Sequence, residues 1–130
     1  MTQMPLFDGD GQPEDDVPEP VFARVEDWVD QYFRPVFRRP VGGVYRWCPR
    51  WWAHAEAVTR LTALWRAWES CRLEPATGIA DWLRDYLDPE MSALLSAQGP
   101  FYQCDPESGH TEPKEFPADP VDPGTFGVPS

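Results

Sequence analysis

The 130-residue sequence is poor in lysine, cysteine and histidine. Lys114 is its single lysine, so arginine carries almost all of its positive charge. It has no run of about eighteen apolar residues, and its first residues have neither a basic start nor an apolar leader core, so we expect no membrane association and a cytoplasmic location. An odd set of three cysteines is atypical of a disulfide framework and leaves thiols available for a metal ion.

The motifs of common enzyme classes are also missing. The sequence contains no glycine-rich phosphate loop, no serine, histidine and aspartate in the order of a hydrolase, and no pair of histidines flanking a glutamate. Its close acidic pairs, such as Asp81 with Asp85, are typical of helix surfaces rather than of paired acid and base catalysts. We therefore expect no enzymatic activity, no catalytic residues and no small-molecule substrate.

Acidic residues outnumber basic ones, and the excess is concentrated at the two ends of the sequence. The formal net charge is −11. Residues 1–20 contain six acidic side chains, four prolines and no basic residue, while residues 111–130 contain five prolines and four acidic residues. Such compositions bury too little apolar surface to offset the entropy of ordering the chain. We expect a disordered acidic tail at 1–20, one domain at 21–110, and a disordered proline-rich tail at 111–130.

Apolar residues recur at helical spacing through the central region, which predicts a small all-α bundle of about four helices with irregular ends. The first helix is expected over residues 21–34, because Pro35 would end it. The longest helix is expected over residues 49–73, because Pro49 suits a first helical position.

The second half of the domain is expected to hold two shorter helices. One spans residues 79–87, and Asp88 with Pro89 is expected to cap and open the next. Residues 44–47 have strand-like side chains. One short two-stranded pairing with residues 101–103 would bring the cysteines that follow these segments side by side.

Four of the five cysteine and histidine residues form two matched arms with the spacing Cys-x5-His: Cys48 with His54, and Cys104 with His110. An aromatic residue precedes each cysteine closely, and a proline follows it. Two cysteines and two histidines are a standard tetrahedral ligand set for structural zinc. We predict one structural Zn²⁺ per chain bound by these four residues, with no coordination position left open for catalysis.

The third cysteine, Cys71, is excluded from this set by geometry. It would share a continuous helix with His54, and seventeen residues of helix place their backbones about 25 Å apart. Cys71 is therefore expected to fill the core as a small apolar residue. In the alternative interpretation of the arms, the histidines are ordinary surface residues and the other two cysteines are buried thiols.

Arginine and tryptophan are interleaved between residues 38 and 52, and the only acidic residues between positions 34 and 72 are Glu56 and Glu69. Arginine interleaved with tryptophan suits a surface that stacks bases and contacts the phosphates of single-stranded nucleic acid, or another anion. The candidate contacts are Arg38, Arg39, Arg46, Arg50 and Trp51. Alternatively, the tryptophans of this stretch enclose the metal site and anchor the long helix, because small domains commonly spend aromatic residues on their cores.

Three runs of residues carry a resemblance to a known family: VYRWCPRWWAHAEAVTRLTALWRAWE, ATGIADWLRDYLDP, and GPFYQC with its histidine six positions after the cysteine. The sequence resembles a bacterial family, common among actinobacteria, known as domain-of-unknown-function family 4913. The resemblance covers residues 44–110 and leaves both tails outside. It implies no assigned activity, a frequent location near plasmid, phage or conjugative functions, and the same four ligand positions without Cys71.

From these observations we expect a non-enzymatic, zinc-stabilised interaction or adaptor module that is linked to mobile-element biology and has an unidentified protein partner. The alternative is a nucleic-acid-binding accessory protein that uses the arginine and tryptophan stretch.

Overall fold

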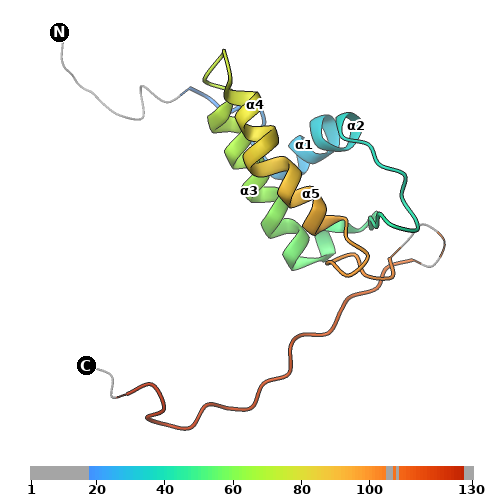
Figure 1. Ribbon diagram of the computed structural model, residues 1–130, viewed down its shortest axis with the longest axis vertical. Coiled ribbons are helices and arrows are strands. Elements are labelled where there is room, and N and C mark those ends of the chain that lie inside the picture. The colour runs from blue at the N-terminus through green and yellow to red at the C-terminus, as the bar shows by residue number, and fades with distance from the viewer. Residues whose placement is uncertain (1–17, 105–106, 108, 128–130) are drawn as a thin grey trace.

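A computed structural model describes residues 18–104, 107 and 109–127 (Figure 1). Within this part of the chain the regular structure is helical, and extended backbone forms no more than isolated bridges. The first helical segment joins α1 (Val25–Trp28), a π-helical turn (Val29–Phe33) and α2 (Arg34–Val36). The second joins a 3₁₀ turn (Trp51–Ala53) to α3 (Ala55–Cys71). The third joins α4 (Gly78–Trp82), a second π-helical turn (Leu83–Leu87) and α5 (Asp88–Leu94).

The fold is therefore all-α, as the apolar pattern predicts, but the expected number of four helices is one too high. Asp88 has helical backbone angles, φ −59° and ψ −48°, so the chain runs through it without a break. Asp88 and Pro89 lie inside the third helical segment instead of opening a new helix. Pro35 likewise lies inside the first segment, which continues to Val36.

Both prolines are tolerated because each follows a π-helical turn. In a regular helix the proline ring clashes with the carbonyl group of the residue four positions earlier. The turn Val29–Phe33 precedes Pro35, and the turn Leu83–Leu87 precedes Pro89 in the same register. A π-helical turn holds one extra residue, which moves the carbonyl groups away from the following ring. The local rule that proline ends a helix is wrong at both places for this reason.

The first and second helical segments also begin later than their patterns predict. Residues 21 and 22 precede α1 and lie outside the helix, and both of their N–H groups donate hydrogen bonds, of 3.0 and 2.9 Å, to the carboxylate of Glu69 on α3. The long helix begins at Ala55 instead of Pro49. His54 has extended angles, φ −100° and ψ 113°, and stands at the N-cap position of α3.

The core is built mainly of aromatic and leucine side chains between α1, α3 and the third helical segment. Trp28 and Trp82 have no exposed surface, and their rings meet edge to face with centroids 6.2 Å apart. The indole N–H of Trp82 donates a 3.1 Å hydrogen bond to the carbonyl oxygen of Leu64 on α3. Figure 1 shows α3 and α5 side by side, with the end of α5 close to the start of α3. That shared end is where the two cysteine arms enter.

The loop between the first two helical segments does not form the predicted strand pairing. Val41 and Gly42 bridge back to Tyr45 around a tight turn, in which Gly42 and Gly43 have positive φ of 105° and 63°. The N–H of Arg46 then donates a 2.9 Å hydrogen bond to the carbonyl oxygen of Leu95, at the end of α5. In the described residues the loop is therefore fixed by the end of α5 rather than by pairing with residues 101–103.

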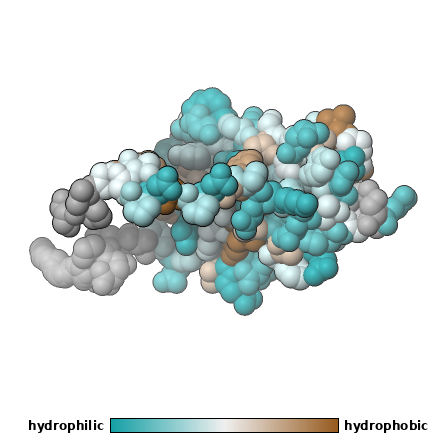
Figure 2. Space-filling view, turned by 90° about the horizontal axis from the view of Figure 1, so that it is seen from below, coloured by the Kyte–Doolittle hydropathy of each residue, from teal (hydrophilic) through white to brown (hydrophobic). Residues whose placement is uncertain are grey.

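The described part of the C-terminal region, residues 111–127, contains no helix or strand. It runs away from the helices (Figure 1), and the side chains of Phe116 and Phe126 are 96% and 89% exposed. The space-filling view from below shows a surface that is mostly hydrophilic, with scattered hydrophobic residues (Figure 2). Most of the predicted acidic tail, residues 1–17, lies outside the described residues, and the disorder of both tails stays a prediction. None of the helices described is long and apolar enough to cross a membrane.

Candidate metal centre

The first arm, Cys48 to His54, lies between the Arg46 loop and the start of α3. Cys48 has no exposed surface, and a 3₁₀ turn follows it at Trp51–Ala53. The turn ends at His54, whose extended backbone takes it out of the helix. The imidazole is 3% exposed and is directed into the same buried volume as the Cys48 thiol.

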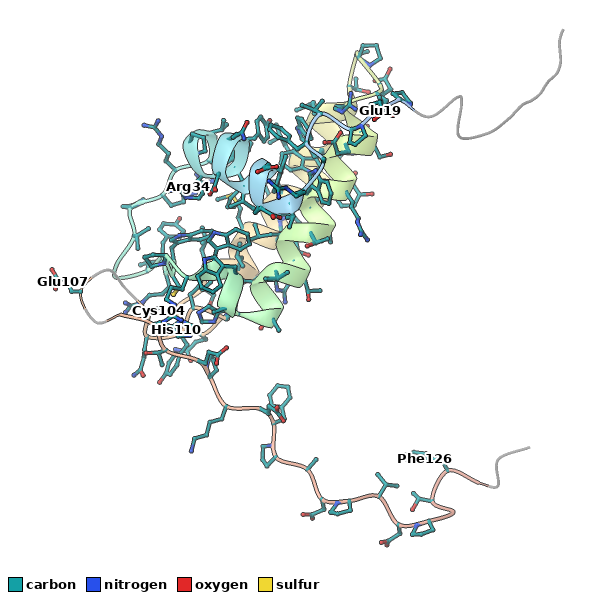
Figure 3. All side chains as sticks on the ribbon, turned by 180° about the vertical axis from the view of Figure 1, so that it is seen from behind. Glu19, Arg34, Cys104, Glu107, His110 and Phe126 are labelled. Carbon is teal, nitrogen blue, oxygen red and sulfur yellow. The ribbon has the colours of Figure 1, made fainter. Side chains whose placement is uncertain are left out.

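The second arm arrives from the end of α5. The chain leaves the helix at Leu95 and turns at Gly99, where a Cβ atom would lie 2.5 Å from the carbonyl oxygen of Ala93. The fully buried ring of Phe101 then anchors the arm, and Gln103 takes a positive φ of 63° just before the fully buried Cys104. His110 is half-buried. Figure 3 shows Cys104 and His110 together below the helices.

The ligand atoms of the two arms converge. The candidate atoms of Cys48, His54, Cys104 and His110 all lie within 4.8 Å of one another. The arms pair crosswise: Cys48 Sγ lies 3.3 Å from His110 Nδ1, and Cys104 Sγ lies 3.6 Å from His54 Nε2. The four residues that the spacing singled out therefore form one cluster that could hold a metal ion.

Aromatic side chains surround the cluster and fix its histidines. The rings of His54 and Phe101 meet edge to face at a centroid distance of 5.0 Å, and His54 and His110 lie 4.6 Å apart in the same manner. Trp47 packs against Phe101 at 5.0 Å. Because these rings exclude water, metal bound here would be shielded from solvent on the side of the core.

Thr111 holds the Cys104 thiol through both of its backbone groups. Its N–H donates a hydrogen bond to Sγ at 3.2 Å, and the thiol donates to its carbonyl oxygen at 3.0 Å. A metal-bound thiolate would keep the first of these bonds and give up the second, because it has no proton to donate. The first residue after the second arm is thereby tied directly to the cluster.

The protonation of His54 favours metal binding. Burial lowers the pKa of its imidazole below the ordinary value, the nearby His110 lowers it further, and Glu112 and the backbone of Pro100 act in the opposite direction. A lowered pKa keeps the ring neutral near pH 7, and the neutral ring is the form that coordinates metal.

Cys71 lies outside the cluster, as its helical distance from His54 predicts. It is the last residue of α3, half-buried against the apolar core. Burial raises the pKa of its thiol, with smaller contributions from Asp81 and Asp85, so this cysteine is not activated as a thiolate.

The arginine and tryptophan stretch divides into buried and exposed parts. Trp51 is 6% exposed and belongs to the hydrophobic core, so little of its ring is accessible for the predicted stacking. The neighbouring Trp52 is 59% exposed, and the guanidinium of Arg50 lies 5.6 Å from the centre of its ring. Arg38 and Arg39 are exposed, and Arg46 is half-buried with its N–H bound to the end of α5.

Thr111 and Phe101 were missed as site residues by the sequence reasoning. Neither has a metal-ligating side chain, and no local pattern marks a residue whose contribution is a backbone N–H or a packing surface. The sequence does carry a signal for Phe101. A large aromatic residue that follows the turn residues Gly99 and Pro100 and shortly precedes the second arm suggests a buried anchor for that arm.

These features define a class: a small helical domain in which two Cys-x5-His arms meet at a buried Cys2His2 cluster. The family model described as "Domain of unknown function (DUF4913)" matches residues 22–124, and the chain belongs to this family. The match is longer than the predicted range of 44–110, since it includes the first helix and most of the C-terminal segment. No curated protein and no solved structure matches the chain.

Proposed function

We propose that the protein is a non-enzymatic interaction module whose fold is stabilised by one structural zinc ion. The observation that carries the proposal is the convergence of the two arms on one buried point. Cys48 and His54 would hold the ion from the start of α3, and Cys104 and His110 would hold it from the segment after α5. The zinc would supply a cross-link between these two parts of the chain.

The distances in the cluster fit zinc. With Zn–S bonds of about 2.3 Å and Zn–N bonds of about 2.0–2.1 Å, a sulfur and a nitrogen ligand of a regular tetrahedron lie about 3.5 Å apart. The two crosswise sulfur–nitrogen distances are 3.3 and 3.6 Å. Two thiolates and two imidazoles also favour zinc over magnesium or calcium, which prefer oxygen ligands.

A structural role is favoured over a catalytic one by the number and burial of the ligands. Four protein ligands complete a tetrahedral shell, whereas catalytic zinc sites keep one position for water or substrate. Three of the four ligand residues are buried, and His110 is half-buried. We therefore propose that the surface which this cross-link holds in place, rather than the ion itself, meets the partner.

The proposal is tested first by the metal content of the purified full-length protein. Elemental analysis against protein concentration should give one zinc per chain. The Cys48→Ser variant should lose most of the metal, whereas Cys71→Ser should retain it, since Cys71 lies outside the cluster. A parent protein that carries no zinc after purification and takes up none in titration would contradict the metal part of the proposal.

The second candidate function is binding of single-stranded nucleic acid, and one observation favours it: Arg50 and Trp52 form an exposed cation–π pair within the first arm. With Trp51 buried, Trp52 would supply the stacking surface, and Arg38 and Arg39 would contact phosphates. Binding to a single-stranded oligonucleotide should then weaken steeply with salt and with Trp52→Ala. Binding that is insensitive to both changes would remove this candidate.

The frequent location near mobile elements that the family resemblance implies suggests where to look for a partner. We propose that the module acts beside plasmid, phage or conjugative functions. Affinity capture with the full-length protein against the products of genes encoded next to it tests this link. The destabilised Cys104→Ser variant shows whether capture depends on the intact fold.

A further inference from the structure

A pocket lies on the surface between α2, the loop that follows it and the end of α5. It has a volume of about 260 Å³. Apolar side chains line most of it, and three arginines stand among them: Phe33, Phe37, Val41, Tyr45, Trp47 and Leu95, with Arg34, Arg38 and Arg39. A pocket smaller than about 300 Å³ is below the usual size of a small-molecule site, and it suits one large side chain of a peptide.

Two of the three arginines have their positive charge available. Arg38 Nε donates to the carbonyl oxygen of Pro35 at 2.8 Å, and Arg39 donates to the carbonyl oxygen of Arg38 at 2.9 Å and to Met91 Sδ at 3.8 Å. Within the described part of the chain, neither has a carboxylate partner. The third, Arg34, pairs with Asp30 at 3.2 Å, and both of these side chains are more than half exposed. The pocket is therefore apolar inside and positively charged at its rim.

The C-terminal segment 111–127 has the opposite character. Its charged residues are four acids and one lysine, and its prolines are spaced along an exposed backbone that forms neither helix nor strand. Phe116 is 96% exposed, follows Glu115 directly and is followed three residues later by Asp119. Phe126 is similarly exposed, but its nearest acidic residue is Asp122, four residues away. Within four residues of Phe116 lie three acidic residues and Lys114, so the sequence around Phe116 is more negatively charged than the sequence around Phe126.

This segment is part of the family domain, because the family match extends to residue 124. An extended segment that leaves its own helices and exposes a phenylalanine gains nothing from hydrophobic burial within the chain. Its presence in the family pattern is explained if the segment is buried against another surface.

We propose that the pocket receives the Phe116 segment of a second copy of this chain, with Phe116 inside and the flanking carboxylates on Arg38 and Arg39. The inference deepens the proposed interaction role and rests on it. Apolar filling and opposite charges make the two surfaces complementary, and the carboxylate–guanidinium pairs fix the register of the peptide.

The path of the backbone favours binding of the Phe116 segment in the pocket of a second copy over binding in the pocket of its own chain. The segment is tied to the metal centre at Thr111, and Pro113 and Pro117 restrict the backbone on both sides of Phe116 to extended conformations. Figure 3 shows that Arg34, which lines the pocket, and Phe126, near the end of the segment, lie far apart. Residues in such an extended path advance about 3.1 Å each. The segment can therefore extend to the pocket of another molecule without turning back toward its own helices.

Self-association of the full-length protein tests the proposal directly. Sedimentation equilibrium over a range of concentrations should show a reversible dimer or larger assembly. Phe116→Ala should weaken the association about tenfold or more, whereas Phe126→Ala should leave it nearly unchanged. Both phenylalanines are exposed, so neither change should alter the fold, and metal content with thermal unfolding verifies this for every variant.

A peptide experiment then locates the contact. The receptor is the full-length Phe116→Ala variant, whose own tails no longer compete, and the probe is a fluorescent peptide of residues 111–127. Binding should be lost with a Phe116→Ala peptide and with a receptor that also carries Arg38→Glu and Arg39→Glu. A peptide with Glu115→Arg and Asp119→Arg should restore binding to that receptor. Arg66→Glu, at another exposed arginine, is the matched control and should have little effect.

Each other result overturns the proposal. If the parent stays monomeric while the peptide binds the Phe116→Ala receptor, the segment occupies the pocket of its own chain. If peptide binding is unchanged by the substitutions at Arg38 and Arg39, the peptide binds at another place on the surface. An oligonucleotide that binds at these arginines when the peptide does not makes nucleic acid the occupant. In all three cases an intact zinc site leaves the metal part of the proposed function standing, so the two failures are distinguishable.

Discussion

Replacement of Cys104 by serine should remove a cross-link that spans much of the chain. Serine is close to cysteine in size and keeps an acceptor for the Thr111 N–H, but it is a poor zinc ligand. The change therefore separates loss of the metal from loss of packing. We expect the variant to bind little zinc and to unfold at a much lower temperature than the parent.

The size of the effect follows from the separation of the paired ligands. Cys48 and His110 are 62 residues apart, and His54 and Cys104 are 50 residues apart. Closing one loop of about 60 residues stabilises a fold by about 4 kcal/mol in the chain-entropy description of cross-links. Domains of this size unfold with a total of about 5–15 kcal/mol, and each kcal/mol moves the unfolding midpoint by about 4–8 °C. The midpoint should therefore fall by about 15–30 °C.

Circular dichroism at the helical minimum, recorded during heating with stoichiometric zinc and with a chelator, measures this effect. The parent should lose about as much stability in chelator as Cys104→Ser loses by mutation, and the variant should respond little to the chelator. Cys71→Ser is the control, because it changes a half-buried thiol outside the cluster. Equal midpoints for parent and Cys104→Ser, or a parent that ignores the chelator, would refute the cross-link.

Three further predictions concern the packing of the helices. Trp51→Ala should cost about 3–5 kcal/mol in chemical denaturation because its ring is 6% exposed, while Trp52→Ala, at 59% exposure, should cost under about 1 kcal/mol. Gly78→Ala should cost about 1–3 kcal/mol, because its Cβ would overlap the carbonyl oxygen of Cys71; equal stability would show that this turn relaxes freely. Glu69→Ala should cost about 1–3 kcal/mol, because two backbone N–H groups before α1 lose their acceptor. Burial raises the pKa of the Glu69 carboxyl, but the two backbone hydrogen bonds and the Arg72 guanidinium lower it by more, so the pKa lies below its ordinary value of 4.5. The stability that ionised Glu69 contributes should therefore be fully present above pH 4.5 and should be lost as the pH falls through the lowered pKa.

The ligand set could be predicted from the sequence because its information is local. Each Cys-x5-His arm is a short stretch, and the helical distance between His54 and Cys71 excludes the third cysteine without any knowledge of the fold. How the arms meet was not accessible in this way. The predicted strand pairing is replaced by the hydrogen bond from Arg46 to Leu95, which joins residues far apart in the sequence.

Helix boundaries were least predictable at prolines. Pro35 and Pro89 both carry a strong local signal for a helix end or start, yet both lie within helices because a π-helical turn precedes them. Such a turn depends on how the helix packs against the core, so the residues next to the proline do not reveal it. Trp51 shows the same limit for function, since a tryptophan between arginines has the same local pattern whether its ring is buried or exposed.

The order of the ligands along the chain also has a consequence during synthesis. Sixty-two residues separate Cys48 from His110, and a ribosome that adds about 5–20 residues per second takes about 3–12 s to cover them. For most of that interval the nascent chain presents one of the two ligand thiols and one of the two ligand imidazoles, half of a tetrahedral shell. Any chain terminated before His110 lacks a complete set of ligands. Metal retention would therefore distinguish finished chains from truncated ones, and it would do so before any partner is met.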